Sequence, residues 1–204
     1  MRLPGFYNCP CLWKDLPGLL EEARREGCTC SLGPQYDASE QWQGLEEIYP
    51  LLDVFIPNEL EARKLSGYHD IEEAARFFIA KGVGLVVITQ GAAGGFAMQS
   101  RDRETETNGT GGSQSERLRA EEGHTRWDQT CRSVKVVDTT GAGDAFSAGF
   151  LYAWKVTGGN VQTALAWGCA MGTSVVLKVG ASVALTLQEI EANLCSIMDS
   201  DKEG

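Results

Sequence analysis

The chain has 204 residues, 43% of them apolar and 23% charged, a composition typical of a globular protein rather than a fibrous or wholly disordered one. The 28 acidic residues outnumber the 18 basic ones, and a net charge of −10 argues against binding to nucleic acid or to an anionic membrane. No apolar run approaches the roughly 20 residues of a membrane span, and residues 1–10 lack the apolar centre of a signal peptide, so we expect a cytoplasmic protein.

The seven cysteines are expected to be reduced thiols, because the sequence shows no sign of secretion. Cys9 and Cys11, and again Cys28 and Cys30, form two Cys-x-Cys pairs that raise the question of a zinc site. Zinc sites more often use Cys-x-x-Cys, and cysteine is also a small apolar residue that is commonly buried. We therefore favour buried thiols over a metal site.

Helices alternate with short strands in the first part of the chain. Apolar spacing and turn residues predict, in order, a helix at 12–27, a strand at 28–32, a loop at 33–44, a helix at 45–52 and a strand at 53–57. Asn58 then caps a new helix. A helix at 71–81, a strand at 85–89 that is covered on both faces, a glycine-rich turn and a strand at 95–99 follow.

Residues 100–128 differ from the rest of the chain. Their only sizeable apolar residues are Leu118 and Trp127, among many Glu, Arg, Gly, Ser and Thr. Such a segment buries too little apolar surface to offset its ordering entropy. We interpret 100–128 as a disordered polar insertion, most simply a solvated linker without a function of its own.

The last third returns to a regular pattern. It predicts a strand at 133–137, a turn at 138–144, and helices at 145–156, 160–177 and 187–198. Strands that alternate with helices indicate an α/β fold with a mostly parallel sheet and right-handed crossovers. Ligands of such sheets bind at the carboxyl ends of the strands, where the glycine-rich turns of this chain lie.

The turn at residues 138–144, Asp-Thr-Thr-Gly-Ala-Gly-Asp, carries the clearest chemical signal. Small residues directly before a helix let backbone N–H groups approach an anion, and the helix dipole favours negative charge there. Asp144 stands in the first helical turn, where its carboxylate could accept a proton from an attacking hydroxyl. The alternative is a tight turn in which Asp144 only favours the helix N-terminus. The turn is neither a Walker P-loop nor a dinucleotide fingerprint, because no Lys-Ser/Thr follows and Phe146 replaces the third glycine.

Residues 137–151, Val-Asp-Thr-Thr-Gly-Ala-Gly-Asp-Ala-Phe-Ser-Ala-Gly-Phe-Leu, closely resemble the C-terminal signature of the PfkB, or ribokinase-like, carbohydrate kinases. Residues 58–61, Asn-Glu-Leu-Glu, resemble the N-x-x-E motif of that family. Residues 88–94 resemble its strand and turn around the ATP phosphates, and residues 165–182 its nucleotide-side helix and closing turn. The resemblance covers the chain apart from the insertion. It implies a three-layer αβα fold and an ATP-dependent kinase that phosphorylates a hydroxyl of a sugar, a nucleoside or a related small molecule.

The resemblance also implies roles for particular residues. Asp144 is the implied catalytic base, and the implied anion hole for the transferring phosphoryl group consists of Gly141, Ala142 and Gly143. Contacts to the nucleotide are implied for Thr89, Gly91, Gly94 and Cys169. A monovalent cation, with K⁺ as the candidate, is implied at Asp138, Thr140 and Gly180.

Asn58 and Glu61 are implied to act through Mg²⁺ and its waters, as suits a strongly hydrated cation. Taken alone, Asn58 reads as a helix cap and Glu61 as part of a solvated helix face.

The chain departs from the family in three places. The N-terminal strands, the sugar-binding motifs and the β-sheet lid have no counterpart, so 1–204 is expected to be a partial kinase domain. Cys169 stands where many members carry an asparagine near the adenine, and Gly33 where a polar residue is expected on the substrate side. An unpaired sheet edge would favour a homodimer, a partner chain or aggregation.

Three hypotheses remain open from the sequence. The chain is an active kinase, a non-catalytic nucleotide-binding remnant or subunit that lacks the acceptor site, or an incomplete copy of a longer kinase. The long polar insertion favours either a lineage-specific loop or an erroneous gene model.

Overall fold

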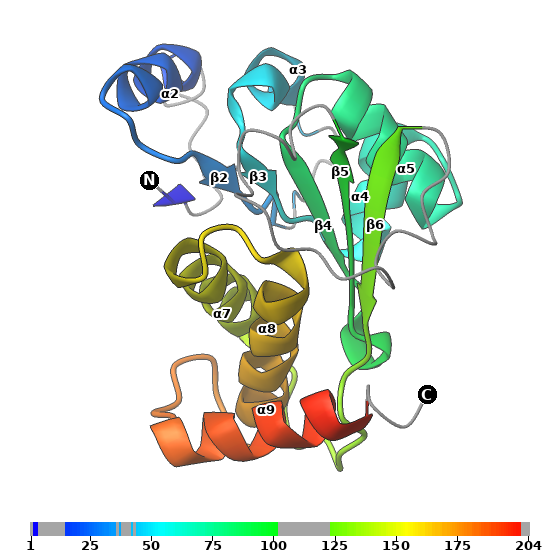
Figure 1. Cartoon of the computed structure of the whole chain (residues 1–204), viewed down its shortest axis with the longest axis vertical. Coiled ribbons are helices and arrows are strands. Elements are labelled where there is room, and N and C mark those ends of the chain that lie inside the picture. Colours follow the sequence, from blue (N-terminus) through cyan, green and yellow to red (C-terminus); the bar gives the residue numbers. More distant parts are fainter. Residues whose placement is uncertain are drawn as a thin grey trace. The chain divides into compact units, whose positions relative to one another are not determined.

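The structure, a computed structural model, describes residues 2–3, 15–35, 37, 42, 44–101 and 123–200 (Figure 1). The described residues divide into two compact units. Among the described residues, unit 1 comprises those up to Ile88 together with 97–101 and 123–126, and unit 2 comprises Thr89–Phe96 and those from Trp127 onward. Each unit is described by itself below.

Six strands pair in chain order into one sheet. They are β1 (Arg2–Leu3), β2 (Ser31–Leu32), β3 (Val54–Phe55), β4 (Leu85–Thr89), β5 (Gly95–Ser100) and β6 (His124–Gln129). The pairs β1–β2, β2–β3 and β3–β4 are parallel. β4 and β5 are joined by the short turn 90–94, which is too short for a parallel crossover, so these two strands are antiparallel. The sheet is therefore mixed, with the parallel part that the sequence predicts.

Unit 1 carries the helices α2 (Leu16–Arg25), α3 (Leu45–Ile48), α4 (Glu59–Ser66) and α5 (Ile71–Ala80), and the short 3₁₀ turn η1 (Tyr49–Leu51). Its core contains three buried aromatic rings, Tyr49, Phe55 and Phe78, with centroids 4.9–5.5 Å apart. Edge-on and tilted contacts of this kind add to the free energy gained by burial. They connect the strand β3 to the helices around it.

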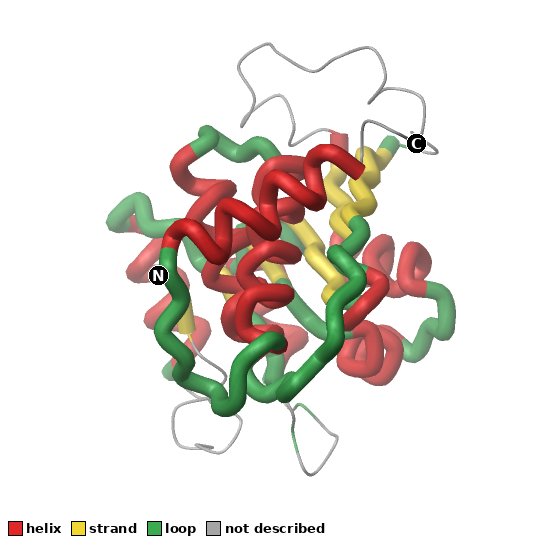
Figure 2. The backbone as a smooth tube through the Cα atoms, turned by 90° about the horizontal axis from the view of Figure 1, so that it is seen from below, coloured by secondary structure: helices red, strands yellow, loops and turns green. Residues whose placement is uncertain are grey.

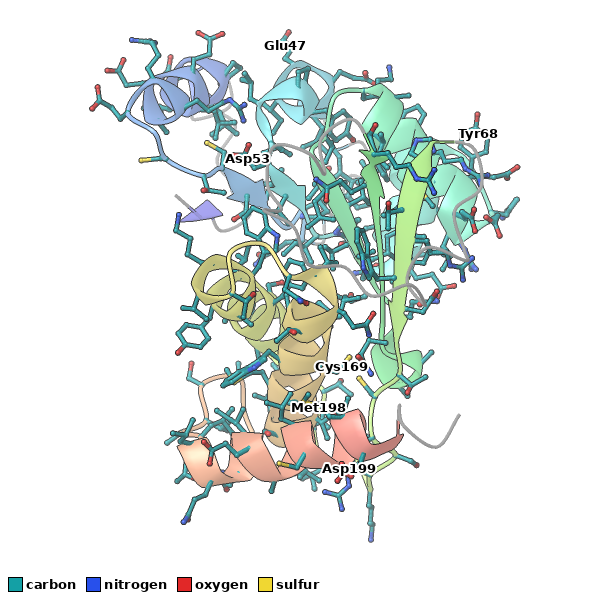
Figure 3. The ribbon with its side chains drawn as sticks, viewed as in Figure 1. Glu47, Asp53, Tyr68, Cys169, Met198 and Asp199 are labelled. Carbon is teal, nitrogen blue, oxygen red and sulfur yellow. The ribbon has the colours of Figure 1, made fainter. Side chains whose placement is uncertain are left out.

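β2 is shorter than predicted, because the N–H group of Cys30 is hydrogen-bonded to an aspartate side chain instead of to a neighbouring strand. The Asp53 carboxylate, labelled in Figure 3, accepts a hydrogen bond from the Cys30 N–H at 2.7 Å and pairs with Arg24 at 2.8 Å. Cys28–Cys30 is therefore irregular, and β2 begins at Ser31. Cys30 is nonetheless fully buried, as the apolar interpretation of the cysteines predicts.

Unit 2 holds α7 (Ala142–Val156), α8 (Val161–Val176) and α9 (Leu187–Ser200), with α8 packed against both others. The irregular segment 130–141 leads from β6 into α7, and the segment 177–186 connects α8 to α9; loops such as these are green in Figure 2. α7 and α8 approach closely at Gly149, where a Cβ atom would lie 2.7 Å from the Trp167 carbonyl oxygen. A larger residue there would separate the two helices.

Two sequence predictions about the region before α7 are wrong. Residues 133–137 form no strand: Val136 and Val137 are about half exposed, and the Val137 N–H donates to the Val176 carbonyl oxygen beyond the sheet. The strand lies earlier, at β6. Five residues of the predicted insertion, His124–Asp128, therefore belong to β6, and its first residue, Ser100, ends β5. Residues 102–122 lie outside the described residues.

β6 forms although it is polar, because its side chains find partners. Arg126 donates to Glu72 on α5 at 2.6 Å, and both residues belong to unit 1. At the other end Gln129 is buried and accepts a hydrogen bond from Gln162 at 2.8 Å, within unit 2. A strand at the end of a sheet needs only one paired edge, so apolar alternation is a poor guide to it.

Within the part of the chain that the structure describes, no helix has both the length and the apolar character needed to cross a bilayer. The five cysteines in that part form no disulfide with one another, and no group of three or more His, Cys, Asp or Glu residues there suits a metal ion. Cys9 and Cys11 lie outside the described residues.

Candidate functional site

The N-terminus of α7 is the centre of the candidate site. Gly141 precedes the helix with a φ of 81°, a left-handed conformation that favours glycine. A Cβ atom on Gly141 would also lie 2.7 Å from the Ala181 carbonyl oxygen, so the turn is held against the segment that follows α8. Glycine at position 141 therefore suits both the left-handed backbone conformation and the close contact with Ala181.

The predicted catalytic and anion-binding residues surround this helix start. Asp144 lies in the first turn of α7 and is exposed, as is Gly143, beside which a Cβ atom would meet open space. The first N–H groups of a helix lack intrahelical acceptors and attract anions. The Ala142 N–H instead donates to the Thr139 carbonyl oxygen at 3.2 Å, so Ala142 shapes the turn.

Asp138 fixes the other side of the turn. Its Oδ1 accepts hydrogen bonds from the Thr140 N–H at 2.9 Å and the Thr140 hydroxyl at 2.7 Å. Its Oδ2 accepts from the Gly180 N–H at 2.9 Å. These bonds, those from Thr140 first, lower the pKa of Asp138 to about 2. The three residues predicted to hold a monovalent cation therefore do come together.

The turn between β4 and β5 supplies the predicted nucleotide contacts of unit 2. Thr89 ends β4 and is partly exposed, and Gly91 is exposed at the start of the 3₁₀ turn η2 (Gly91–Ala93). Gly94 is different, because it is buried and a Cβ atom there would lie 1.9 Å from the Gln129 carbonyl oxygen. Gly94 thus serves the packing of the turn on the end of β6.

Cys169 lies in α8 on the side of the helix that faces the end of β6, where Figure 3 labels it. Its side chain is fully buried, and its Sγ lies 3.9 Å from the Gln129 carbonyl oxygen. Cys169 and Gly94 therefore contact the same peptide group of β6. The sequence predicts Cys169 as a nucleotide contact but gives no sign of this shared neighbour.

Asn58 and Glu61 belong to unit 1, where they form a reciprocal cap on α4. Asn58 Oδ1 accepts from the Glu61 N–H, and Glu61 Oε2 accepts from the Asn58 N–H, both at 2.9 Å. The helix-cap interpretation of Asn58 is thus confirmed. The solvated-face interpretation of Glu61 is wrong, because Glu61 is only 7% exposed and its burial raises its pKa.

Phe146 is a supporting residue whose packing role the motif analysis does not predict. Its buried ring lies 2.9 Å from the position that a Cβ atom would take on Gly95, and equally close to that on Gly168. The ring therefore packs α7 against the start of β5 and against α8, two residues after Asp144 in the same helix. Gly95 and Gly168 leave room for the Phe146 ring, and the sequence alone does not indicate this role.

The sequence matches the pfkB family of carbohydrate kinases over residues 10–187. The chain belongs to this family. It is 29% identical to a cytidine kinase of Thermococcus kodakarensis over 135 residues, which are 65% of this chain and 41% of that protein. It is 27% identical to a ribokinase of Staphylococcus aureus over 149 residues, which are 70% of this chain and 41% of that protein. The chain thus spans less than half the length of these two relatives.

Comparison with solved structures gives the same fold. A structure from E. coli, described as a ribokinase II in complex with ATP and Mg²⁺, matches with a TM-score of 0.68 and 20% identity. The match covers 100% of this chain and 58% of the other. The predicted ribokinase-like α/β fold class is therefore confirmed.

Proposed function

We propose that the chain supplies the phosphoryl-transfer part of an ATP-dependent carbohydrate kinase, a transferase acting on a hydroxyl of a sugar or nucleoside. The observation that carries the proposal is the helix start at Gly141–Asp144, where an exposed carboxylate stands beside an open, glycine-lined N-terminus. Sugar and nucleoside kinases among the relatives support the substrate class. The net charge of −10 supports small-molecule substrates rather than nucleic acid or membranes. We propose that the protein acts in the cytoplasm.

In this proposal the Asp144 carboxylate accepts the proton of the acceptor hydroxyl as its oxygen attacks the γ-phosphoryl group. The N–H groups at the start of α7, with Gly141 and Gly143 keeping the approach open, stabilise the negative charge on the transferring group. Thr89 and Gly91 contact the nucleotide from the β4–β5 turn. Asp138, already bonded to Thr140 and Gly180, holds the turn for this task.

Asn58 and Glu61 suit Mg²⁺ by their chemistry, because the ion prefers oxygen ligands and keeps several waters. Glu61 uses Oε2 in the helix cap, and its Oε1 would be the oxygen to accept hydrogen bonds from such waters. When bound, Mg²⁺ would neutralise phosphate charge. We propose K⁺ at the Asp138 turn as a further cofactor, on the support of the three residues gathered there.

The test is transfer of phosphate from Mg-ATP to a panel of sugars and nucleosides, with Asp144→Asn and Glu191→Gln compared. Removal of a general base lowers turnover by about 10²–10⁴-fold. Asp144→Asn should show this loss while still binding ATP, and Glu191→Gln, an exposed residue of α9, should leave turnover unchanged. Equal turnover in Asp144→Asn and the unsubstituted chain would refute the assigned base.

A second candidate is a non-catalytic nucleotide-binding subunit. The chain spans 41% of the length of two relatives, so the activity of those whole proteins is a proposal for this chain. ATP binding without transfer to any acceptor would support the second candidate. Transfer by this chain alone would exclude it.

A further inference from the structure

An ion pair closes the base of the loop that follows α8. The Nζ of Lys178, just after that helix, lies 2.8 Å from Oε1 and 3.0 Å from Oε2 of Glu189, in the first turn of α9. The same Nζ donates to the Ala184 carbonyl oxygen at 2.8 Å. The loop 178–184, orange in Figure 1, is thereby joined at its two ends. All of these residues belong to unit 2.

Both partners of the ion pair are held by the backbone around them. The Lys178 N–H donates to the Val175 carbonyl oxygen and so continues the last turn of α8. Glu189 Oε2 also accepts from the Thr186 N–H at 2.7 Å, while the Thr186 hydroxyl oxygen accepts from the Glu189 N–H at 3.3 Å. Thr186 and Glu189 thus form a reciprocal cap on α9. The ion pair therefore connects the end of one helix to the start of the next.

α9 is itself bonded to α8 one turn further along. Asn193 Nδ2 donates to the Ser174 hydroxyl oxygen at 2.8 Å, and both of these side chains are buried. Arg132, in the segment after β6, donates to Asn193 Oδ1 at 3.1 Å. Residues four apart lie on the same face of a helix, so Glu189 and Asn193 both face α8. Glu189 therefore projects from a helix whose position is fixed.

The loop that the ion pair closes contacts the candidate site. The Gly180 N–H donates to Asp138 Oδ2 at 2.9 Å. The Ala181 carbonyl oxygen lies 2.7 Å from the position that a Cβ atom would take on Gly141. Because residues 177–186 form no helix or strand, the position of the loop depends on side-chain bonds such as those of Lys178.

We propose that Lys178 and Glu189 are positioning residues for phosphoryl transfer: their ion pair closes the loop 178–184 and so holds it against the turn that leads into α7. The effect on catalysis rests on the proposed function, whereas the effect on the loop does not. Neither side chain has to touch a substrate. An open loop would let the turn shift, and a misplacement of about 1 Å can lower a catalysed rate by about 10²-fold.

The hold on the loop is tested on the whole chain without any nucleotide. Lys178→Met keeps the aliphatic stem and removes the charge and the donors. The Gly180 amide hydrogen should exchange with solvent about tenfold faster in this variant, because exchange follows local opening. Lys178→Arg, which keeps a cation suited to a carboxylate, should restore slow exchange. The matched control Lys155→Met, at an exposed position of α7, should leave it unchanged. Equal exchange at Gly180 in Lys178→Met and the unsubstituted chain would overturn the proposal.

Kinetics separate positioning from a purely structural role. In transfer of phosphate from Mg-ATP, Lys178→Met should lower kcat by about tenfold and leave the KM for ATP within about twofold. Because the two residues act as a pair, adding Glu189→Gln to this variant should cause no further loss. An unchanged kcat despite faster Gly180 exchange would overturn the positioning role. An unsubstituted chain that transfers no phosphate would refute the proposed function instead, and the exchange at Gly180 would then decide the inference.

Discussion

Asp138 shows how single hydrogen bonds set the pH range of the candidate site. Its pKa falls to about 2 in the folded chain, below its usual value of 3.8, chiefly through the bonds from Thr140. The folded state therefore holds fewer protons at this group, so its stabilising effect is present above about pH 4 and is lost as the pH falls toward 2. Asp138→Asn removes this dependence. Urea unfolding from pH 3 to 6 should show a flatter stability profile in the variant, with Glu191→Gln unchanged, and parallel profiles would contradict the assignment.

The pKa of Glu61 is shifted in the opposite direction to that of Asp138, so its effect on stability changes with pH in the opposite sense. Burial raises its pKa, so the folded chain holds an extra proton and loses stability as the pH rises from the unfolded value through the folded one. Glu61→Gln keeps the oxygen that accepts from the Asn58 N–H but never ionises. We expect the variant to lose less stability than the unsubstituted chain between pH 4 and 8, and to lose Mg²⁺-dependent ATP binding. Normal Mg²⁺ dependence in the variant would confine Glu61 to the helix cap.

Single residues also show what a sequence can and cannot predict. The turn at Gly141, the place of Asp144 in the first helical turn and the Asn58 cap were predictable, because turn geometry and capping depend on residues within a few positions. The part that Glu61 takes in the same cap was missed, because its side chain was interpreted as solvated. The packing of Gly94 on Gln129 and the contact of Cys169 with the same Gln129 carbonyl oxygen were not predictable. These contacts join segments far apart in the chain, and no local pattern marks them.

At the scale of elements, the contact between α7 and α8 depends on one glycine. A Cβ atom on Gly149 would lie 2.6 Å from the Met171 Cγ and 2.7 Å from the Trp167 carbonyl oxygen, and the backbone atom cannot move aside. Overpacking of this kind costs about 1–3 kcal/mol, and we expect Gly149→Ala to lose that much stability in chemical unfolding.

The matched control is Gly143→Ala, in the same helix but in open space. Because alanine favours a helix over glycine, this variant should be unchanged or stabilised by up to about 1 kcal/mol. Equal losses in the two variants would contradict the close approach of the helices.

The elements themselves were predicted unevenly. The strong apolar periodicity of the sequence predicted α5, α8 and β4 with nearly the bounds that the structure shows. β6 was missed because His124–Gln129 is polar and stabilised by side-chain partners such as Glu72. The predicted strand at 133–137 was wrong, because the Val137 N–H donates to the Val176 carbonyl oxygen at the end of α8 instead of to a strand. Periodicity reports burial, so it fails where hydrogen bonds at an edge decide the structure.

At the scale of the whole molecule, the chain spans less than half the length of two relatives. Large apolar side chains such as Tyr152, Val156 and Val179 are more than half exposed. Exposed apolar surface favours association, so we expect the purified chain to self-associate at micromolar concentration. Light scattering coupled to size exclusion measures this. A monodisperse monomer with a sharp unfolding transition would contradict it.

The central claim is that the start of α7 binds the phosphates of a nucleotide. Titration of Mg-ATP into the ¹⁵N-labelled, reduced chain, followed by the amide resonances, tests it most directly. We predict saturable shifts of the amide resonances of Gly141, Gly143 and Asp144, with further shifts at Thr89 and Gly91. Adenosine, which carries no phosphate, should leave the resonances of Gly141, Gly143 and Asp144 unchanged. Saturable binding that leaves the amides of Gly141–Asp144 unmoved, or no binding at all, would contradict the account.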